Sequence, residues 1–235
     1  TNTMKKIYSI IGFLSMFCVA SAQNIAVVSE EVAIQKPISA ALASQMVLDT
    51  LTPPSYTMSC FTSDPSPFVF YKVGAAGYLA GTNSYGVTEC AQRYTFTGSG
   101  TISEVLVHYG KKAGTAGTTS AKIYSIDATT KKPSAVLATS GNTITTGSIA
   151  TNAYSVYTFS PNVSVNTDFA VASVLLTTAA SGDSVVVVST RVKCSSDSMS
   201  FLNSTQWGGW QTIAFLISNV GANDTSIDLV ILPVV

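Results

Sequence analysis

The chain has 235 residues, of which 46% are hydrophobic and only 10% are charged, and its twelve basic and twelve acidic residues give a formal net charge of zero. Nucleic acids and anionic membrane surfaces attract proteins through excess positive charge, so we expect no nucleic-acid partner. Ser, Thr and Asn supply most of the polarity, which together with Thr-rich and Val-rich segments is typical of an extracellular β-protein.

The first 22 residues have the order of an upstream extension and a secretory signal. Lys5 and Lys6 precede the apolar run Ile7 to Val19, and the small residues Ala20, Ser21 and Ala22 follow it. This charged, apolar and small-residue order predicts cleavage after Ala22. The apolar run is shorter than the roughly 20 residues that cross a bilayer as a helix, so we expect no transmembrane segment in the mature chain. The expected location is extracellular or on the outer cell surface.

Residues 23–48 form a leader segment that we expect to be irregular or partly helical. Ile38 to Leu48 is the stretch with helix-forming composition and a rough helical period. Pro53 and Pro54 then interrupt any regular element. We therefore place a single compact domain at 49–235.

From residue 92 onward the chain predicts strands. Val105, Val107 and Tyr109 alternate with their neighbours at the period of two that a half-buried strand requires. The expected strands are Gln92–Thr97, Ser103–Tyr109, Ala121–Ile126, Ser155–Phe159, Phe169–Leu176, Ser184–Thr190, Thr212–Ser218 and Ser226–Leu232. Short turns rich in Gly, Asn, Pro and Ser separate them, with no long helix between. This pattern predicts an all-β fold, an antiparallel β-sandwich with a jelly-roll-like strand order.

Several segments of the domain resemble a known family. Gly77 to Gly86 (GYLAGTNSYG), followed by Ala91-Gln92-Arg93-Tyr94, is similar to a turn that opens a β-sandwich module in secreted Bacteroidota proteins of the type IX secretion class. The similarity continues through the segments 133–138, 157–165, 168–171 and 182–187. The resemblance implies a surface or extracellular protein. In physical terms Gly77, Gly81 and Gly86 fit backbone positions that need a positive φ or close packing.

The same phylum carries O-glycans at Asp-Ser/Thr-apolar triplets, and the resemblance extends to three of these. They place glycan attachment at Thr50, Ser184 and Ser198.

Three cysteines follow the signal, Cys60, Cys90 and Cys194. Export exposes them to oxidising conditions, so one disulfide among the three is one interpretation and buried free thiols are the other. Their wide spacing does not favour a zinc site.

The residues that catalysis would need are sparse. His108 is the only histidine, and it lies in the middle of an expected strand on the face of Glu104. Neither a Gly-x-Ser-x-Gly motif nor a second strand carboxylate accompanies them. We expect no enzyme and no catalytic residue, with His108 on the sheet surface and Glu104 solvated.

Calcium is the one cofactor with support in the sequence. Asp183, Asp197 and Asp224 lie in expected turns, where carboxylates hold structural Ca²⁺ in many extracellular modules. The alternative is that these aspartates bond to the backbone of their own turns.

Trp207-Gly208-Gly209-Trp210 is the strongest candidate ligand site. Exposed indole rings stack on sugar rings, and Tyr78 and Tyr85 could extend the platform. The alternative is that one tryptophan closes the end of the core.

These features favour a non-catalytic structural or adhesive module of the bacterial cell surface or extracellular matrix. Its expected partners are other copies of itself or surface components. The alternative is a carbohydrate-binding module that takes glycans, and a weaker one is an accessory domain of a secreted hydrolase. The apolar final segment Ile227 to Val235 is expected to lie either at the centre of a sheet or against another subunit.

We predict that the secreted chain begins at or near Gln23, because Ala20 and Ala22 flank the cleavage site. Intact-mass measurement of secreted protein checks this. A secreted species that starts at Met4 would contradict it.

Overall fold

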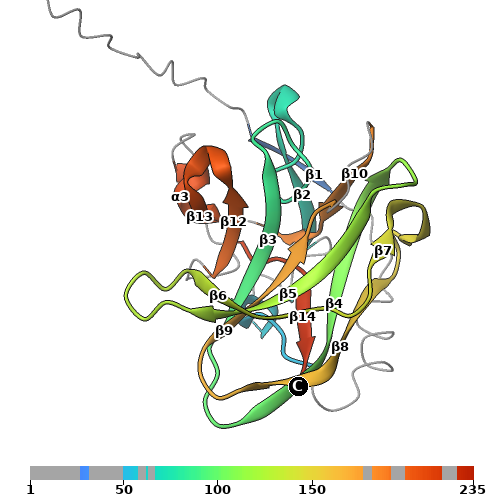
Figure 1. Cartoon of the computed structure of the whole chain (residues 1–235). Helices are drawn as coiled ribbons and strands as arrows, with labels where there is room; N and C mark the ends of the chain where they lie inside the picture. Colours follow the sequence, from blue (N-terminus) through green and yellow to red (C-terminus); the bar gives the residue numbers. More distant parts are fainter. Residues whose placement is uncertain are drawn as a thin grey trace, which may run out of the picture.

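The computed structural model describes residues 27–31, 50–57, 62, 67–176, 182–191, 199–218 and 227–235. Strands dominate these residues and form two groups that pack face to face (Figure 1). Sheet I contains β1 (Val27–Glu31), β2 (Phe68–Val73), β4 (Gly100–Ala113), β8 (Tyr154–Val165), β10 (Ser184–Val187), β11 (Ser189–Thr190) and β14 (Ile231–Val234). Sheet II contains β3 (Val87–Tyr94), β5 (Thr118–Ile126), β6 (Pro133–Thr139), β7 (Ile144–Thr145), β9 (Phe169–Val174), β12 (Ser200–Ser204) and β13 (Gly209–Thr212).

The helical elements are short. They are the 3₁₀ turns η1 (Pro54–Thr57), η2 (Gly74–Ala76), η3 (Thr146–Ser148) and η4 (Thr205–Trp207), and the α-helix α3 (Ile213–Ser218). The sequence predicts a strand over Thr212–Ser218, but β13 ends at Thr212 and α3 follows it. The apolar run IAFLIS fits either element, since a short apolar run does not distinguish a buried strand from a helix.

The strand order is that of a jelly roll. In sheet I, β4 pairs with β8 on one side and with β10 and β14 on the other, while β11 continues β10 and pairs with β2. In sheet II the order is β13-β12-β3-β9-β5-β6. All of these pairings are antiparallel, and the chain alternates between the sheets, as a double Greek key requires. The predicted all-β sandwich is confirmed.

The alternation predicted for β4 is also confirmed. Val105, Val107 and Tyr109 are fully buried between the sheets. The Tyr109 hydroxyl lies 2.6 Å from Ser173 Oγ of sheet II and 3.1 Å from the Tyr157 hydroxyl of sheet I. Hydroxyl groups inside an apolar core lose their water, so these bonds fix how the two sheets face each other.

The glycines of the GYLAGTNSYG turn have the structural role predicted for them. Gly77 and Gly86 have φ angles of 109° and 65°, which favour glycine. A Cβ on Gly81 would lie 2.6 Å from the Val185 carbonyl oxygen, so this turn packs directly on β10.

One part of the leader belongs to the sandwich. We expected irregular or helical structure in residues 23–48, but Val27–Glu31 form β1, which pairs antiparallel with β2. The helical composition of Ile38–Leu48 falls outside the described residues.

The C-terminal segment is internal to sheet I. β14 pairs with β4 on one side, and on the other side Leu229 bridges Ser189 while Val234 bridges Thr50. Residues 227–232 are almost completely buried. Of the two predicted placements, the structure therefore has the strand at the centre of its own sheet.

We predict that deletion of Ile227–Val235 unfolds the whole domain, because it removes an internal strand from sheet I. Leu229→Ala should lower the free energy of unfolding by about 2–5 kcal/mol, the usual cost of truncating a buried leucine. Exposed Val136→Ala is the control, with a change within about 0.5 kcal/mol. Urea unfolding measures all three, and a deletion variant that keeps cooperative unfolding would contradict the prediction.

Candidate functional site

His108 is built into the packing of sheet I. It is 2% exposed, Nε2 lies 3.1 Å from the Thr151 carbonyl oxygen, and the Tyr154 ring lies 5.3 Å away between centroids. We expected a histidine on the sheet surface, but Tyr154, its partner in the β4–β8 ladder, packs against it. Burial lowers the pKa of His108, although the bond to Thr151 opposes this. Glu104 is half-buried beside Thr158 and Val234.

The four aromatic side chains of the predicted sugar platform lie in three different places. Tyr85 and Trp207 pack together, 5.7 Å between centroids, against the main core. Tyr78 packs edge-on against Phe70, and its hydroxyl accepts a hydrogen bond from Lys111 Nζ at 2.9 Å. Trp210 lies on the outer face of sheet II. The structure therefore does not bring the four rings together.

The outer face of sheet II around Trp210 is the place where aromatic and charged side chains converge. Its floor consists of Ala91, Ala170 and Ala172, which are fully buried although they point away from the inter-sheet core. Trp210 of β13 and Tyr124 of β5 come from strands that are separated by three others in sheet II. Their rings meet edge to face on its outer side, 5.4 Å between centroids. The alanines leave room for the two rings to lie across the sheet. We call this surface, with Glu89 and Lys122 beside it, the Trp210 face.

A carboxylate is held at this face without full solvation. Glu89 is 7% exposed and accepts a 2.9 Å hydrogen bond from Lys122 Nζ and a 2.5 Å bond from the Tyr124 hydroxyl. Burial and the Glu89 carboxylate raise the pKa of Tyr124, so its hydroxyl stays protonated as a donor. These bonds hold the Tyr124 ring in position against Trp210.

Further charges lie at the rim. Arg93 forms a 2.6 Å ion pair with Asp168 next to β9. Lys132, in the turn between β5 and β6, donates a 3.0 Å hydrogen bond to Gln211 Oε1 of β13. This bond links the β5–β6 turn to β13, so it joins the two ends of sheet II.

The predicted calcium and glycan residues are only partly within the described chain. Asp183 is buried and accepts a hydrogen bond from the Gly117 amide, in the turn between β4 and β5. Asp197, Asp224 and Ser198 fall outside the described residues, so the calcium site stays a prediction. Thr50 and Ser184 are half-buried, each at the end of a strand pairing.

Cys90 is a buried free thiol of the main core, and burial raises its pKa well above the usual range. Cys60 and Cys194 fall outside the described residues, so a disulfide between them stays a prediction.

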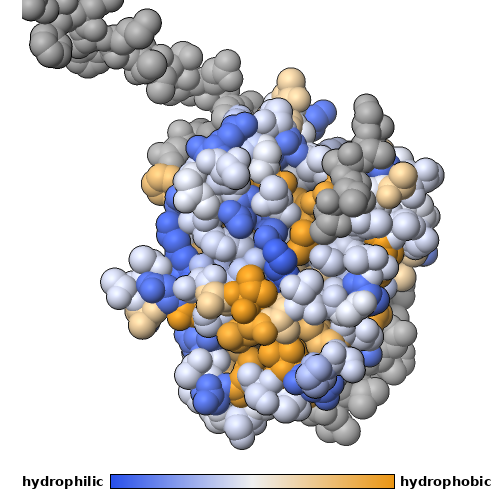
Figure 2. Space-filling model, in the orientation of Figure 1, coloured by the Kyte–Doolittle hydropathy of each residue, from blue (hydrophilic) through white to orange (hydrophobic). Residues whose placement is uncertain are grey.

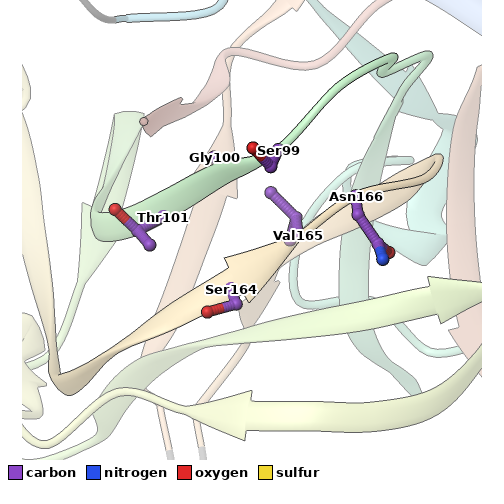
Figure 3. A pocket seen from close by; sticks show the side chains of 6 residues that line it. All are labelled: Ser99, Gly100, Thr101, Ser164, Val165 and Asn166. Atoms are coloured by element: carbon purple, nitrogen blue, oxygen red, sulfur yellow. The ribbon is translucent and has the colours of Figure 1, made fainter.

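A shallow pocket lies where β4 begins and β8 ends (Figure 3). Its lining is small and uncharged: Ser99, Gly100, Thr101, Ser164, Val165 and Asn166. Hydroxyl and amide groups could hydrogen-bond a small polar molecule there, but these six residues include no titratable side chain.

Sequence reasoning missed a buried polar network behind β14. Gln92 Nε2 donates to Asp228 Oδ1 at 2.9 Å, while its Oε1 accepts from Ser200 Oγ at 2.7 Å and from the Leu229 amide at 2.8 Å. Asp228 is 0% exposed. Burial raises its pKa, and the hydrogen bond from Gln92 only partly offsets this. A polar residue inside the apolar run Ile227–Leu232 was the available signal.

Comparison with protein-family models, curated proteins and solved structures found no match to this chain. Among the described residues, no helix is long and apolar enough to cross a membrane. The antiparallel β-sandwich with its jelly-roll order is thus the class that the fold defines.

We predict that Asp228→Asn stabilises the domain at pH 7. Because the folded-state pKa of Asp228 is raised, its contribution is most favourable at low pH and is lost as the pH rises through that pKa. Asp228→Asn should therefore raise the free energy of unfolding most at high pH. This increase should shrink as the pH falls toward about 4, the unfolded-state pKa of an aspartate. Urea unfolding between pH 4 and 8 measures it.

Asp127→Asn is the matched control, because hydrogen bonds from Thr130 lower the pKa of the exposed Asp127. Asp127→Asn should lower the free energy of unfolding at pH 7, the opposite sign to Asp228→Asn. Equal stability of Asp228→Asn and wild type at every pH would show that Asp228 is not held in the buried state described.

Proposed function

We propose that this chain is a non-catalytic, secreted structural or adhesive module of the bacterial cell surface or extracellular matrix. The side chains that could act as an acid or a base support the proposal, because each is engaged in contacts within the fold. The His108 ring is buried against Tyr154, and the Glu89 carboxylate is bound by Lys122 and Tyr124.

The observation that carries an adhesive role is the exposed apolar surface at the sandwich edge. Val136 and Leu137 of β6 are 49% and 48% exposed, and Val156 of β8 is 39% exposed. The pairing with β5 shifts at this point, from Ile123↔Ala138 to Tyr124↔Val136, so Leu137 is an unpaired bulge residue. The bulge allows consecutive apolar residues to be exposed together, where a regular strand would turn one of them inward.

Figure 2 shows apolar atoms gathered in one area of the visible face, over the part of Figure 1 where the labels β5 and β14 stand. Hydrophilic side chains surround this area in the same view. Contiguous apolar surface with a polar rim is typical of an interaction site.

The test uses beads coated with the purified mature chain and measures the attachment of cells that produce it. Val136→Lys with Leu137→Lys should reduce attachment by about tenfold, because two apolar contacts are lost and two charges must be desolvated. Ser134→Lys with Ala135→Lys is the matched control, since both residues are exposed on the same strand and the variant adds the same charge. Equal attachment by both variants and wild type would contradict the adhesive role.

A carbohydrate-binding role is the second candidate, and the Trp210 face favours it. Trp210 is half-buried and packs against Tyr124, whose hydroxyl donates to Glu89, so a partly exposed indole lies close to hydrogen-bonding groups. Glycan-array binding that is lost in Trp210→Ala and retained in Trp210→Phe would support this role. No glycan binding by the wild-type chain would remove it.

A further inference from the structure

β2 is an apolar strand that is buried on both faces. Val69 and Tyr71 pack in the core between the sheets, while Phe68 and Phe70 belong to a second cluster on the opposite face. Lys72 is the exposed residue of this strand. A bare edge of such a strand would pair with any extended chain, because its backbone donors and acceptors would be open beside apolar side chains. β2 therefore needs a neighbour on each side.

The inner neighbours of β2 are supplied by the domain itself. β11 pairs with its first residues, and the segment 77–79 bonds to Tyr71 and Val73. The outer neighbour is β1, which pairs along its whole length, from Val27↔Val73 to Glu31↔Val69. In the part of the chain that the structure describes, β1 forms its ladder with β2 alone.

The connection between β1 and the rest of the domain is long. Eighteen residues, 32 to 49, separate Glu31 from Thr50, which bridges Val234. An extended chain of that length spans up to about 60 Å. A compact domain of this size is about 40 Å across. The connection is therefore long enough for β1 to reach β2 of a neighbouring copy.

We propose that the outer edge of β2 is a strand-acceptor site and that β1 of a second copy of this chain occupies it. The exchanged strand makes the same five-residue antiparallel ladder between copies as within one copy, so no pairing is lost. Association is favoured by concentration and opposed only by the entropy of joining two chains. A chain that gives its β1 and receives another can form closed dimers or longer assemblies. The proposal names a second copy of this chain as the partner. Its biological meaning rests on the structural role proposed above.

The test uses full-length mature chains in which Cys60 and Cys194 are replaced by Ser. One tagged chain carries Val28→Cys and a second, untagged chain carries Lys72→Cys, since these two positions are directly paired in the β1–β2 ladder. Each chain has one introduced cysteine, so a disulfide between them joins two copies. The chains are mixed both in the native state and during refolding from urea, and are then oxidised.

The matched control pairs Val28→Cys with Lys112→Cys. Lys112 is an exposed lysine of β4 whose ladder partner is Val185, away from β2. We expect at least about tenfold more tagged–untagged dimer with Lys72→Cys than with Lys112→Cys, because a disulfide requires Cα atoms within about 7 Å. Equal yields in both mixing protocols would overturn strand exchange.

A single chain carrying both Val28→Cys and Lys72→Cys tests the register itself. Formation of the internal disulfide shows that the two positions are paired, whereas its failure would overturn the acceptor site along with the exchange.

The outcome is separate from that of the adhesion assay. If Val136→Lys with Leu137→Lys abolishes attachment while the disulfide test fails, exchange alone is wrong. If exchange occurs and both double-lysine variants attach as well as wild type, the adhesive role is wrong and the acceptor site stands.

Discussion

The carboxamide of Gln92 is the point on which the arrangement of both sheets and the chain end depends. It lies in β3 of sheet II, bonds to Ser200 of the neighbouring β12, and reaches Asp228 and Leu229 before β14. Thr190 of β11 in turn accepts from the Asp228 amide through its side chain. An unsatisfied buried polar group costs about 1–3 kcal/mol, so a different register of the C-terminal segment would leave several such groups unpaired. Apolar burial drives this segment inside, and the polar bonds select one position for it.

The general architecture follows from features that are local in the sequence. The period of two in β4 places Val105, Val107 and Tyr109 inside, and the structure has all three buried there. Frequent short turns indicate antiparallel pairing, because parallel strands need long crossover connections. The role of the turn glycines can also be predicted from the sequence, since Gly77 and Gly86 adopt the positive φ that other residues avoid. These signals need no knowledge of which strands are neighbours.

The candidate site depends on contacts that no local pattern contains. Trp207 and Trp210 are three residues apart, but η4 and the left-handed Gly208 between them direct one indole to the main core and the other to the outer face. The partner of Trp210 is Tyr124, on the far side of three strands, and the small side chains of Ala91 and Ala172 allow the two rings to meet. A single sequence gives no covariation from which such pairs could be inferred.

The edges of the sheets show why one strand is the natural point of exchange. β8 is covered by the Asn142 amide, which donates to the Val156 carbonyl at 3.0 Å and accepts from the Thr158 amide at 2.8 Å, as a neighbouring strand would. β6 is interrupted by shifts of register, which hinder regular pairing with another chain. The shifts of register lie within β6 itself, and Asn142 is held at β8 by the adjacent Gly141, whose amide donates to the Thr158 carbonyl. The cover on β2 is instead β1, which is joined to the rest of the domain through the eighteen residues 32 to 49, so its effective concentration at β2 is lower than that of a hairpin partner. At high concentration of the chain, the β1 of another copy therefore competes on nearly equal terms.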